Sequence, residues 1–281
     1  MLRRPVRLPV PAAADLWMLA ALAAPAAWFF REALLRGRVF YKRDIHLLWY
    51  GQTETFVRAV AAGSWPTWNP YVGFGQPMWA NPDAQVAYPL TWTSLLLAPW
   101  TQYTFFAVFH LCWAAVGTYV LGRRLTLSRG AALAGALAFA SSGPLLSTAD
   151  TWHHFASACW MPWVVAAADA TARTRRWPWA LGWGTASGMQ LLAGSADMTV
   201  MTGLVAAAHV ILHLDWRRPW PQRDAIARAA LAAAVAAGLS AALWLPTLDV
   251  VRRSTRTGLL EGMRTYWSVH PLTALDVVIP G

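Results

Sequence analysis

The chain has 281 residues, of which 57% are hydrophobic and 13% are charged. Soluble domains carry about 25% charged residues, so this composition excludes an ordinary soluble protein and indicates a membrane protein. The formal net charge of +10 does not indicate nucleic-acid binding, because the arginines fall in short clusters between apolar runs. The 19 tryptophans agree with a membrane location, since indole rings favour the level of the lipid headgroups.

Apolar runs recur along the whole chain, and a helix needs about 20 such residues to cross a bilayer. The seven candidate spans are residues 12–30, 102–121, 130–148, 155–170, 179–192, 198–214 and 225–245. The fourth and fifth are short, and Pro162 predicts a kink or a partly buried helix. The sequence therefore predicts an all-α polytopic membrane protein, with residues 1–281 forming a single transmembrane domain.

Two apolar stretches allow other interpretations. The first run follows a basic start and could be a cleaved signal peptide, but its length favours a retained membrane anchor. Residues 90–100 are apolar but too short to span, so we expect a re-entrant or interfacial segment there.

The arginines predict the orientation of the chain. If the N-terminus is cytoplasmic, the inner segments contain Arg3, Arg4, Arg7, Arg123, Arg124, Arg129, Arg173, Arg175, Arg176, Arg217, Arg218, Arg223 and Arg228. The short loops on the other side, residues 150–154 and 195–197, contain none. The positive-inside rule then predicts a multi-pass membrane protein with a cytoplasmic N-terminus. Residues 31–101 and 246–281 would be extracytoplasmic, the second being the start of another large outer loop.

The first outer segment contains an amphipathic pattern over residues 44–63. Its apolar face would be Ile45, Leu48, Trp49, Phe56 and Val60, and its polar face His46, Tyr50, Thr53, Glu54 and Arg58. This spacing predicts a helix that lies flat on the membrane surface. Asp44 stands at its start, where a carboxylate can cap free backbone N–H groups.

A stretch rich in proline and aromatic residues follows, SWPTWNPYVGFGQPMWANPDAQVAYPL at residues 64–90. Its five prolines exclude a helix, and it lacks the two-residue alternation of a strand. We therefore expect a long loop without regular structure. Loops of this length are usually functional or disordered, and so many aromatic rings argue against disorder.

Five landmarks resemble, in order, those of the bacterial YfhO-type membrane proteins. They are "RD" followed by "WNPYVGFGQPMWANPDAQVAYPL", "SSGPLLSTADTWHH" with "WMPWV", "QLLAG", "LWLPTLDVVRRSTR" and "YWSVHPLTALDVVIP". That family is similar to the GT-C glycosyltransferases, so the resemblance implies a GT-C-like fold and transfer of a sugar from a polyprenyl-phosphate carrier. Family members are considerably longer, so we expect this chain to be an N-terminal fragment.

Glycosyl transfer needs a base for the acceptor hydroxyl and groups that hold the leaving phosphate. Asp44 fits the base by its position, and the resemblance implies an acidic residue early in the first outer loop. The alternative is that Asp44 only caps the amphipathic helix.

A second candidate lies in "TADTWHHF", where Asp150, His153 and His154 fall in a turn between two spans. These residues could contact a sugar or phosphate, or bind a divalent metal, or simply form a polar interfacial turn. Adjacent histidines are a weak metal pattern, because neighbouring side chains on a helix diverge. Asp197, in "GSADM", is a third acid at the same level.

Polar groups among the rings of residues 64–90 could bind a sugar. Asn69, Asn81 and Asp83 would contact its hydroxyls, with Trp68, Tyr71, Trp79 and Tyr88 as an apolar platform. The alternative is that the rings anchor the loop at the interface. Arg252 and Arg253 could hold the carrier phosphate or contact headgroups. Asp169, His110, His209 and His213 lie near or within spans, where ionisable groups are functional candidates.

The resemblance thus implies a membrane glycosyltransferase-like protein of the bacterial inner (plasma) membrane, with membrane lipids, a polyprenyl-phosphate-linked sugar and an envelope polymer or glycolipid as its partners. One alternative is a transporter or flippase-like protein without chemistry, which would need polar residues along its spans. Another is a scaffold protein of envelope biogenesis, which would tolerate the loss of Asp44.

Overall fold

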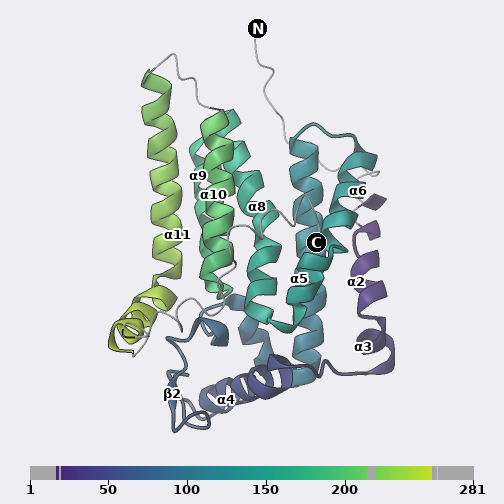
Figure 1. Ribbon diagram of the computed structural model, residues 1–281, viewed down its shortest axis with the longest axis vertical. Helices are drawn as coiled ribbons and strands as arrows, with labels where there is room; N and C mark the ends of the chain where they lie inside the picture. Colours follow the sequence, from purple (N-terminus) through teal and green to yellow (C-terminus); the bar gives the residue numbers. More distant parts are fainter. Residues whose placement is uncertain (1–16, 19, 214–218, 255–257, 259–281) are drawn as a thin grey trace.

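The computed structural model describes residues 17–18, 20–213, 219–254 and 258. In these ranges the chain is mostly helical, and its long helices stand side by side (Figure 1). The bundle consists of α5 (Pro99–Arg124), α6 (Arg129–Ala140), α8 (Trp152–Thr174), α9 (Trp177–Leu192), α10 (Ala196–Leu212) and α11 (Pro219–Arg253). Between α6 and α8 lie α7 (Gly143–Ser147) and the 3₁₀ turn η4 (Thr148–Asp150).

Three helical stretches, Pro99–Arg124, Arg129–Asp150 and Arg223–Arg253, are long and apolar enough to cross a membrane. A fourth, α10, is apolar but shorter. These findings agree with the predicted all-α membrane protein. The three long stretches match the second, third and seventh apolar runs, and α8, α9 and α10 are helices at the positions of the fourth, fifth and sixth.

The first apolar run is described only from residue 17 onward, where it includes α2 (Ala24–Phe29). The next residues form a further short helix, α3 (Arg31–Arg36). Gly37 ends α3 with a φ of 62°, a left-handed conformation that suits glycine at a helix C-terminus.

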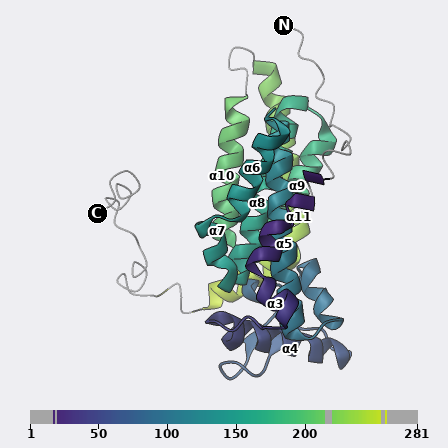
Figure 2. The ribbon, with the colours of Figure 1, turned by 90° about the vertical axis from the view of Figure 1, so that its right-hand side faces the viewer.

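The predicted amphipathic helix lies across one end of the bundle, which we call the α4 end (Figures 1 and 2). It begins with a π-helical turn, η1 (Ile45–Trp49), and continues as α4 (Tyr50–Ala61). Ile45, Trp49 and Phe56 are buried as predicted. Two positions were predicted on the wrong face: Leu48 is 38% exposed and Thr53 is buried. The wider π-turn accounts for this, because it shifts the faces relative to a regular α-helix.

Residues 64–98 pack over the same end. The prediction that residues 64–90 lack regular structure was wrong in detail. Strand β1 (Trp68–Asn69) pairs antiparallel with β2 (Gln76–Pro77). Two 3₁₀ helices follow, η2 (Pro82–Ala84) and η3 (Pro89–Leu95). Each begins at a proline, whose fixed φ suits a first helical position. The prolines that exclude a long helix therefore start short ones.

Small residues let two helices approach closely on one side of the bundle. A Cβ added at Gly184 would lie 2.5 Å from the Ala232 carbonyl oxygen, and one at Gly188 would lie 2.9 Å from the Leu239 side chain. The two glycines are four residues apart and face α11 from α9. This small-xxx-small spacing is how membrane helices bring their backbones together.

Helix α11 extends past the predicted boundary at residue 246 and ends at Arg253. Pro246 lies inside it and has no N–H for the carbonyl of Ala242, four residues earlier. The indole N–H of Trp79 donates to that carbonyl oxygen at 2.6 Å instead. The Thr247 hydroxyl donates to the Ala80 carbonyl at 2.9 Å. These bonds attach the aromatic loop to α11. Residues 255–257 and 259–281 of the expected second outer loop lie outside the described residues.

Candidate functional site

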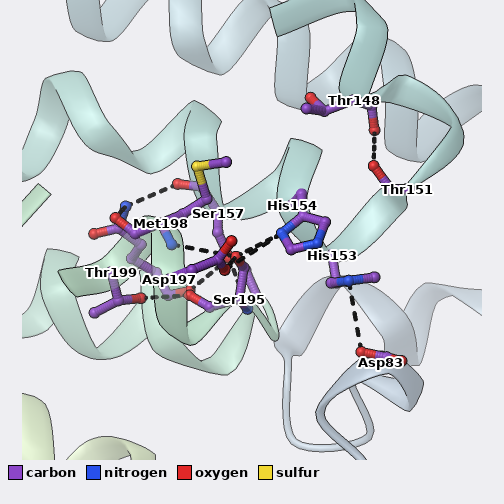
Figure 3. A network of polar contacts seen from close by, with 12 residues as sticks. Asp83, Thr148, Thr151, His153, His154, Ser157, Ser195, Asp197, Met198 and Thr199 are labelled. Carbon is purple, nitrogen blue, oxygen red and sulfur yellow. Dashed lines mark hydrogen bonds and ion pairs between the residues drawn. The ribbon is translucent and has the colours of Figure 1, made fainter. Parts of the chain in front are cut away.

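Polar and charged side chains from five segments meet at the α4 end of the bundle. We call this set the polar cluster: Lys42, Asp44, Asp83, Asp150, His153, His154, Ser195 and Asp197. Figure 3 shows its central part, where the first turn of α8 faces both η2 and the start of α10. Five of the predicted site residues therefore lie in one place, although 39 or more positions separate Asp44 from the others in sequence.

Asp83 and His153 form the first pair, with 3.7 Å between the carboxylate Oδ1 and the imidazole Nε2 (Figure 3). The neighbouring Trp152 indole donates to the Asp83 carbonyl oxygen at 2.7 Å, which holds η2 against α8. Gly194, just before α10, lets its segment approach η2 and α8 closely. A Cβ there would lie 2.5 Å from the Pro82 carbonyl oxygen and 3.1 Å from the His153 Cβ. Its φ of 101° also favours glycine.

His154 faces the start of α10. Its Nδ1 lies 2.8 Å from the Ser195 hydroxyl oxygen and 3.4 Å from Asp197 Oδ1. Ser195 caps α10, with its hydroxyl accepting from the Met198 amide and donating to the Asp197 carboxylate. The expectation that adjacent histidines diverge was wrong for the rings, since the centroids of His153 and His154 are 4.1 Å apart. Their polar partners nevertheless lie on different sides (Figure 3).

Lys42 and Asp150 form the third pair, with 3.8 Å between Nζ and Oδ2. Asp44 is half-buried at the start of η1 and lies close enough to His153 for its charge to act on the imidazole. The prediction that its carboxylate caps the helix was wrong, because the side chain makes no cap hydrogen bond. Asp44 also forms no ion pair in the part of the chain that the structure describes.

Burial and nearby charges shift the pKa values of this cluster in opposite directions. Burial lowers the pKa of the His153 imidazole below its usual value, and the nearby carboxylates, Asp83 above all, only partly offset this effect. The neutral imidazole is therefore favoured. Burial also disfavours the ionised form of Asp197, but the hydrogen bond from Ser195, the nearby His154 and hydrogen bonds from backbone amides outweigh it, so the pKa of Asp197 is lowered.

A divalent metal at this end was one of the open possibilities. Within the described ranges, the only group of three His, Cys, Asp or Glu side chains that could hold a metal ion is Asp169, His209 and His213, at the far end of the bundle. The polar cluster consists of pairs instead, so no metal is assigned to it.

The two predicted asparagines have local partners. Asn69 is buried, and its Oδ1 accepts a hydrogen bond from the Tyr71 amide at 3.0 Å. Asn81 precedes η2, and its Oδ1 accepts from the Asp83 amide at 3.1 Å. Asn81 thus positions the backbone of Asp83 and lies beside the cluster.

The predicted ring platform divides into two groups. Tyr88 is buried in the bundle, where its hydroxyl lies 2.8 Å from His110 Nε2 and accepts from the Trp160 indole at 2.9 Å. It is therefore a core residue and not part of a sugar platform. Trp68 and Tyr71 are exposed, at 53% and 69%, and so remain accessible.

The predicted arginines lie in the last turn of α11 and are exposed. Arg253 forms a salt bridge with Asp249 one turn earlier, at 3.0 Å. A second basic group lies on and after α3, where Glu32 is shared by Arg31, Arg36 and Arg38.

A groove of about 410 Å³ runs between α3 and the beginning of α5. Its lining is mainly apolar and includes Leu34, Val39, Trp100 and Phe105, with Arg38 as its charged residue. The groove thus combines an apolar surface with a guanidinium group from the α3 cluster.

Sequence reasoning missed Lys42 and Ser195. The spacing of Ser195 before α10 is a helix-capping pattern and could have been recognised. Lys42 carries no local signal, because its partner Asp150 is distant in sequence. A comparison of the chain with protein-family models, curated proteins and solved structures found no match.

Proposed function

We propose that this protein transfers a sugar from a polyprenyl-phosphate donor to an envelope polymer or glycolipid at the outer face of the bacterial inner membrane. The α4 end would face outward, the N-terminus inward, and seven passes would form a GT-C-like arrangement. One observation carries the proposal: Asp44 is a half-buried carboxylate without a cap bond or an ion pair among the described residues, and it lies close enough to His153 for its charge to act on the imidazole.

An unpaired carboxylate can accept a proton. In the proposed reaction, Asp44 takes the proton of the acceptor hydroxyl as its oxygen bonds to the anomeric carbon of the sugar. The bond from that carbon to the phosphate oxygen breaks, and the polyprenyl phosphate leaves with the electron pair. The neutral His153 beside Asp44 adds no positive charge that would weaken the base.

The charge of the cluster suits a sugar better than a phosphate. Its four carboxylates face one lysine, since the two imidazoles are already paired with acids. Phosphate would be repelled here, so we assign the hydroxyl groups of the sugar or acceptor to Asp83, Asp150 and the histidines. The exposed Trp68 and Tyr71 could cover an apolar sugar face.

The carrier needs an apolar surface and a cation. The groove beside α3 supplies both, and Arg38 in its wall belongs to a cluster of three arginines around Glu32. We assign the prenyl chain to this groove and the phosphate to Arg38, with Arg252 and Arg253 as further candidates. Guanidinium groups bind phosphate through two hydrogen bonds at once.

The test uses the full-length protein in proteoliposomes with a polyprenyl-phosphate sugar and its acceptor. Asp44→Asn keeps the size of the side chain but removes the base, and should lower the transfer rate by about 100-fold or more. Glu54→Gln is the matched control, because Glu54 is exposed on the neighbouring helix and pairs only with Arg58 among the described residues. It should transfer normally.

Unchanged transfer by Asp44→Asn would remove this residue from the mechanism. A transporter or a scaffold predicts that result, since neither needs a base at this position. Equal loss in both variants would indicate a general defect of α4 rather than a lost base.

A further inference from the structure

A second group of ionisable side chains lies at the end of the bundle opposite α4. Asp169 on α8 is fully buried, and it is faced by His209 on α10 and by His213, the C-cap residue of that helix. Asp169 is 16 residues after His153 on the same helix, which places it about 24 Å away along the helix axis. The group is therefore separate from the polar cluster and has no part in the proposed sugar transfer.

The geometry points to a binding site for a divalent transition metal, formed by Asp169, His209 and His213. One ligand atom from each residue lies within 4.8 Å of the others. The two histidines are four residues apart on one helix, so both rings are on the same face, with centroids 4.7 Å apart. Asp169 supplies an oxygen from the adjacent helix, 2.8 Å from His209 Nε2.

The hydrogen bond of the His213 ring leaves one of its nitrogens a lone pair for a metal. His213 Nδ1 lies 2.8 Å from the His209 carbonyl oxygen, which can only accept, so Nδ1 carries the proton and Nε2 keeps its lone pair. Such a bond to a backbone carbonyl is typical of metal-binding histidines. His209 Nε2 donates to Asp169 in the metal-free site, and a metal would displace that proton.

The second carboxylate oxygen of Asp169 makes an ion pair but no hydrogen bond. Arg173 Nε bonds to Asp169 Oδ1 at 2.5 Å, but Oδ2 is buried without a hydrogen-bond partner, with Arg124 Nε 3.5 Å away. Hydrogen bonds to the carboxylate orient it, as the outer partners of metal ligands usually do. Three ligands would leave a fourth position for water.

The two guanidinium groups also determine which metals can bind. Their positive charge opposes any cation, and most of all those that are held by charge alone, such as Mg²⁺ and Ca²⁺. Zn²⁺ and Ni²⁺ bind imidazole nitrogen strongly enough to tolerate this charge. We therefore expect Zn²⁺ or Ni²⁺ to bind, and Mg²⁺ not to.

The test measures metal binding to the purified full chain in detergent by titration with ZnCl₂, NiCl₂ and MgCl₂. Zn²⁺ should bind at one site and raise the melting temperature. His213→Ala should weaken Zn²⁺ binding by at least about tenfold without lowering the metal-free melting temperature, because His213 has no ion pair in the described chain. His46→Ala, at the α4 end, is the control and should bind normally.

Arg173→Gln distinguishes a metal site from an ion-pair network. Removing the positive charge should strengthen Zn²⁺ binding, even though it weakens the metal-free fold. The proposal is overturned if Zn²⁺ fails to bind, if His213→Ala and His46→Ala bind it equally, or if Arg173→Gln weakens binding. None of these measurements depends on sugar transfer.

Discussion

At the level of single residues, backbone conformation explains one landmark better than chemistry does. Gly194 ends the "QLLAG" motif and carries no functional group, yet three segments of the polar cluster meet at it. Its positive φ and the 2.5 Å from a Cβ to the Pro82 carbonyl oxygen both exclude a side chain.

Gly194→Ala should therefore destabilise the protein by about 1–3 kcal/mol and separate η2 from α8. Gly203→Ala on α10 is the matched control, because its Cβ would meet open space and should stabilise the helix by about 0.5–1 kcal/mol. Thermal unfolding in detergent measures both. Equal melting temperatures of the two variants would show that a side chain at position 194 is tolerated beside Pro82.

At the level of secondary-structure elements, prolines decide where the aromatic loop attaches. Pro246 leaves the Ala242 carbonyl of α11 without a helical N–H donor, and the Trp79 indole N–H donates a hydrogen bond to it. An unpaired carbonyl in a membrane environment is unfavourable, so helix and loop stabilise one another here.

Trp79→Phe should lower the unfolding free energy by about 1 kcal/mol, because the carbonyl loses its donor. In a Pro246→Ala background the helix supplies its own N–H, so the same change should cost measurably less. A double-mutant cycle on thermal unfolding measures the coupling energy between the two substitutions, which we expect to be at least about 0.5 kcal/mol. If the effects of Trp79→Phe and Pro246→Ala on the unfolding free energy were strictly additive, the Trp79 indole would not replace the missing helical N–H donor.

At the level of the whole molecule, the question is which end faces outward. The arginine distribution predicts that residues 64–98 and the polar cluster lie outside, with Arg173, Arg175 and Arg176 inside. Ser64 and Arg176 are both exposed and lie at opposite ends of the bundle.

Ser64→Cys should react with a membrane-impermeant maleimide in intact cells, whereas Arg176→Cys should react only after the membrane is opened. The parent chain measures the background from Cys112 and Cys159, which lie in the bundle, the second fully buried. The reverse pattern would place the polar cluster in the cytoplasm and exclude a reaction at the outer face.

The sequence alone predicted that the chain is helical, that several of its helices are apolar enough to cross a membrane, where α4 lies, and most residues of the polar cluster. These follow from hydropathy, periodicity and residue type, which are local properties of the chain. The tertiary structure decided that Asp44 has no ion pair among the described residues, that Tyr88 belongs to the core and that Lys42 meets Asp150. It also brought Asp169 to the histidines of α10. Each of these facts joins segments distant in sequence, and no local pattern encodes which distant side chains will meet when helices pack.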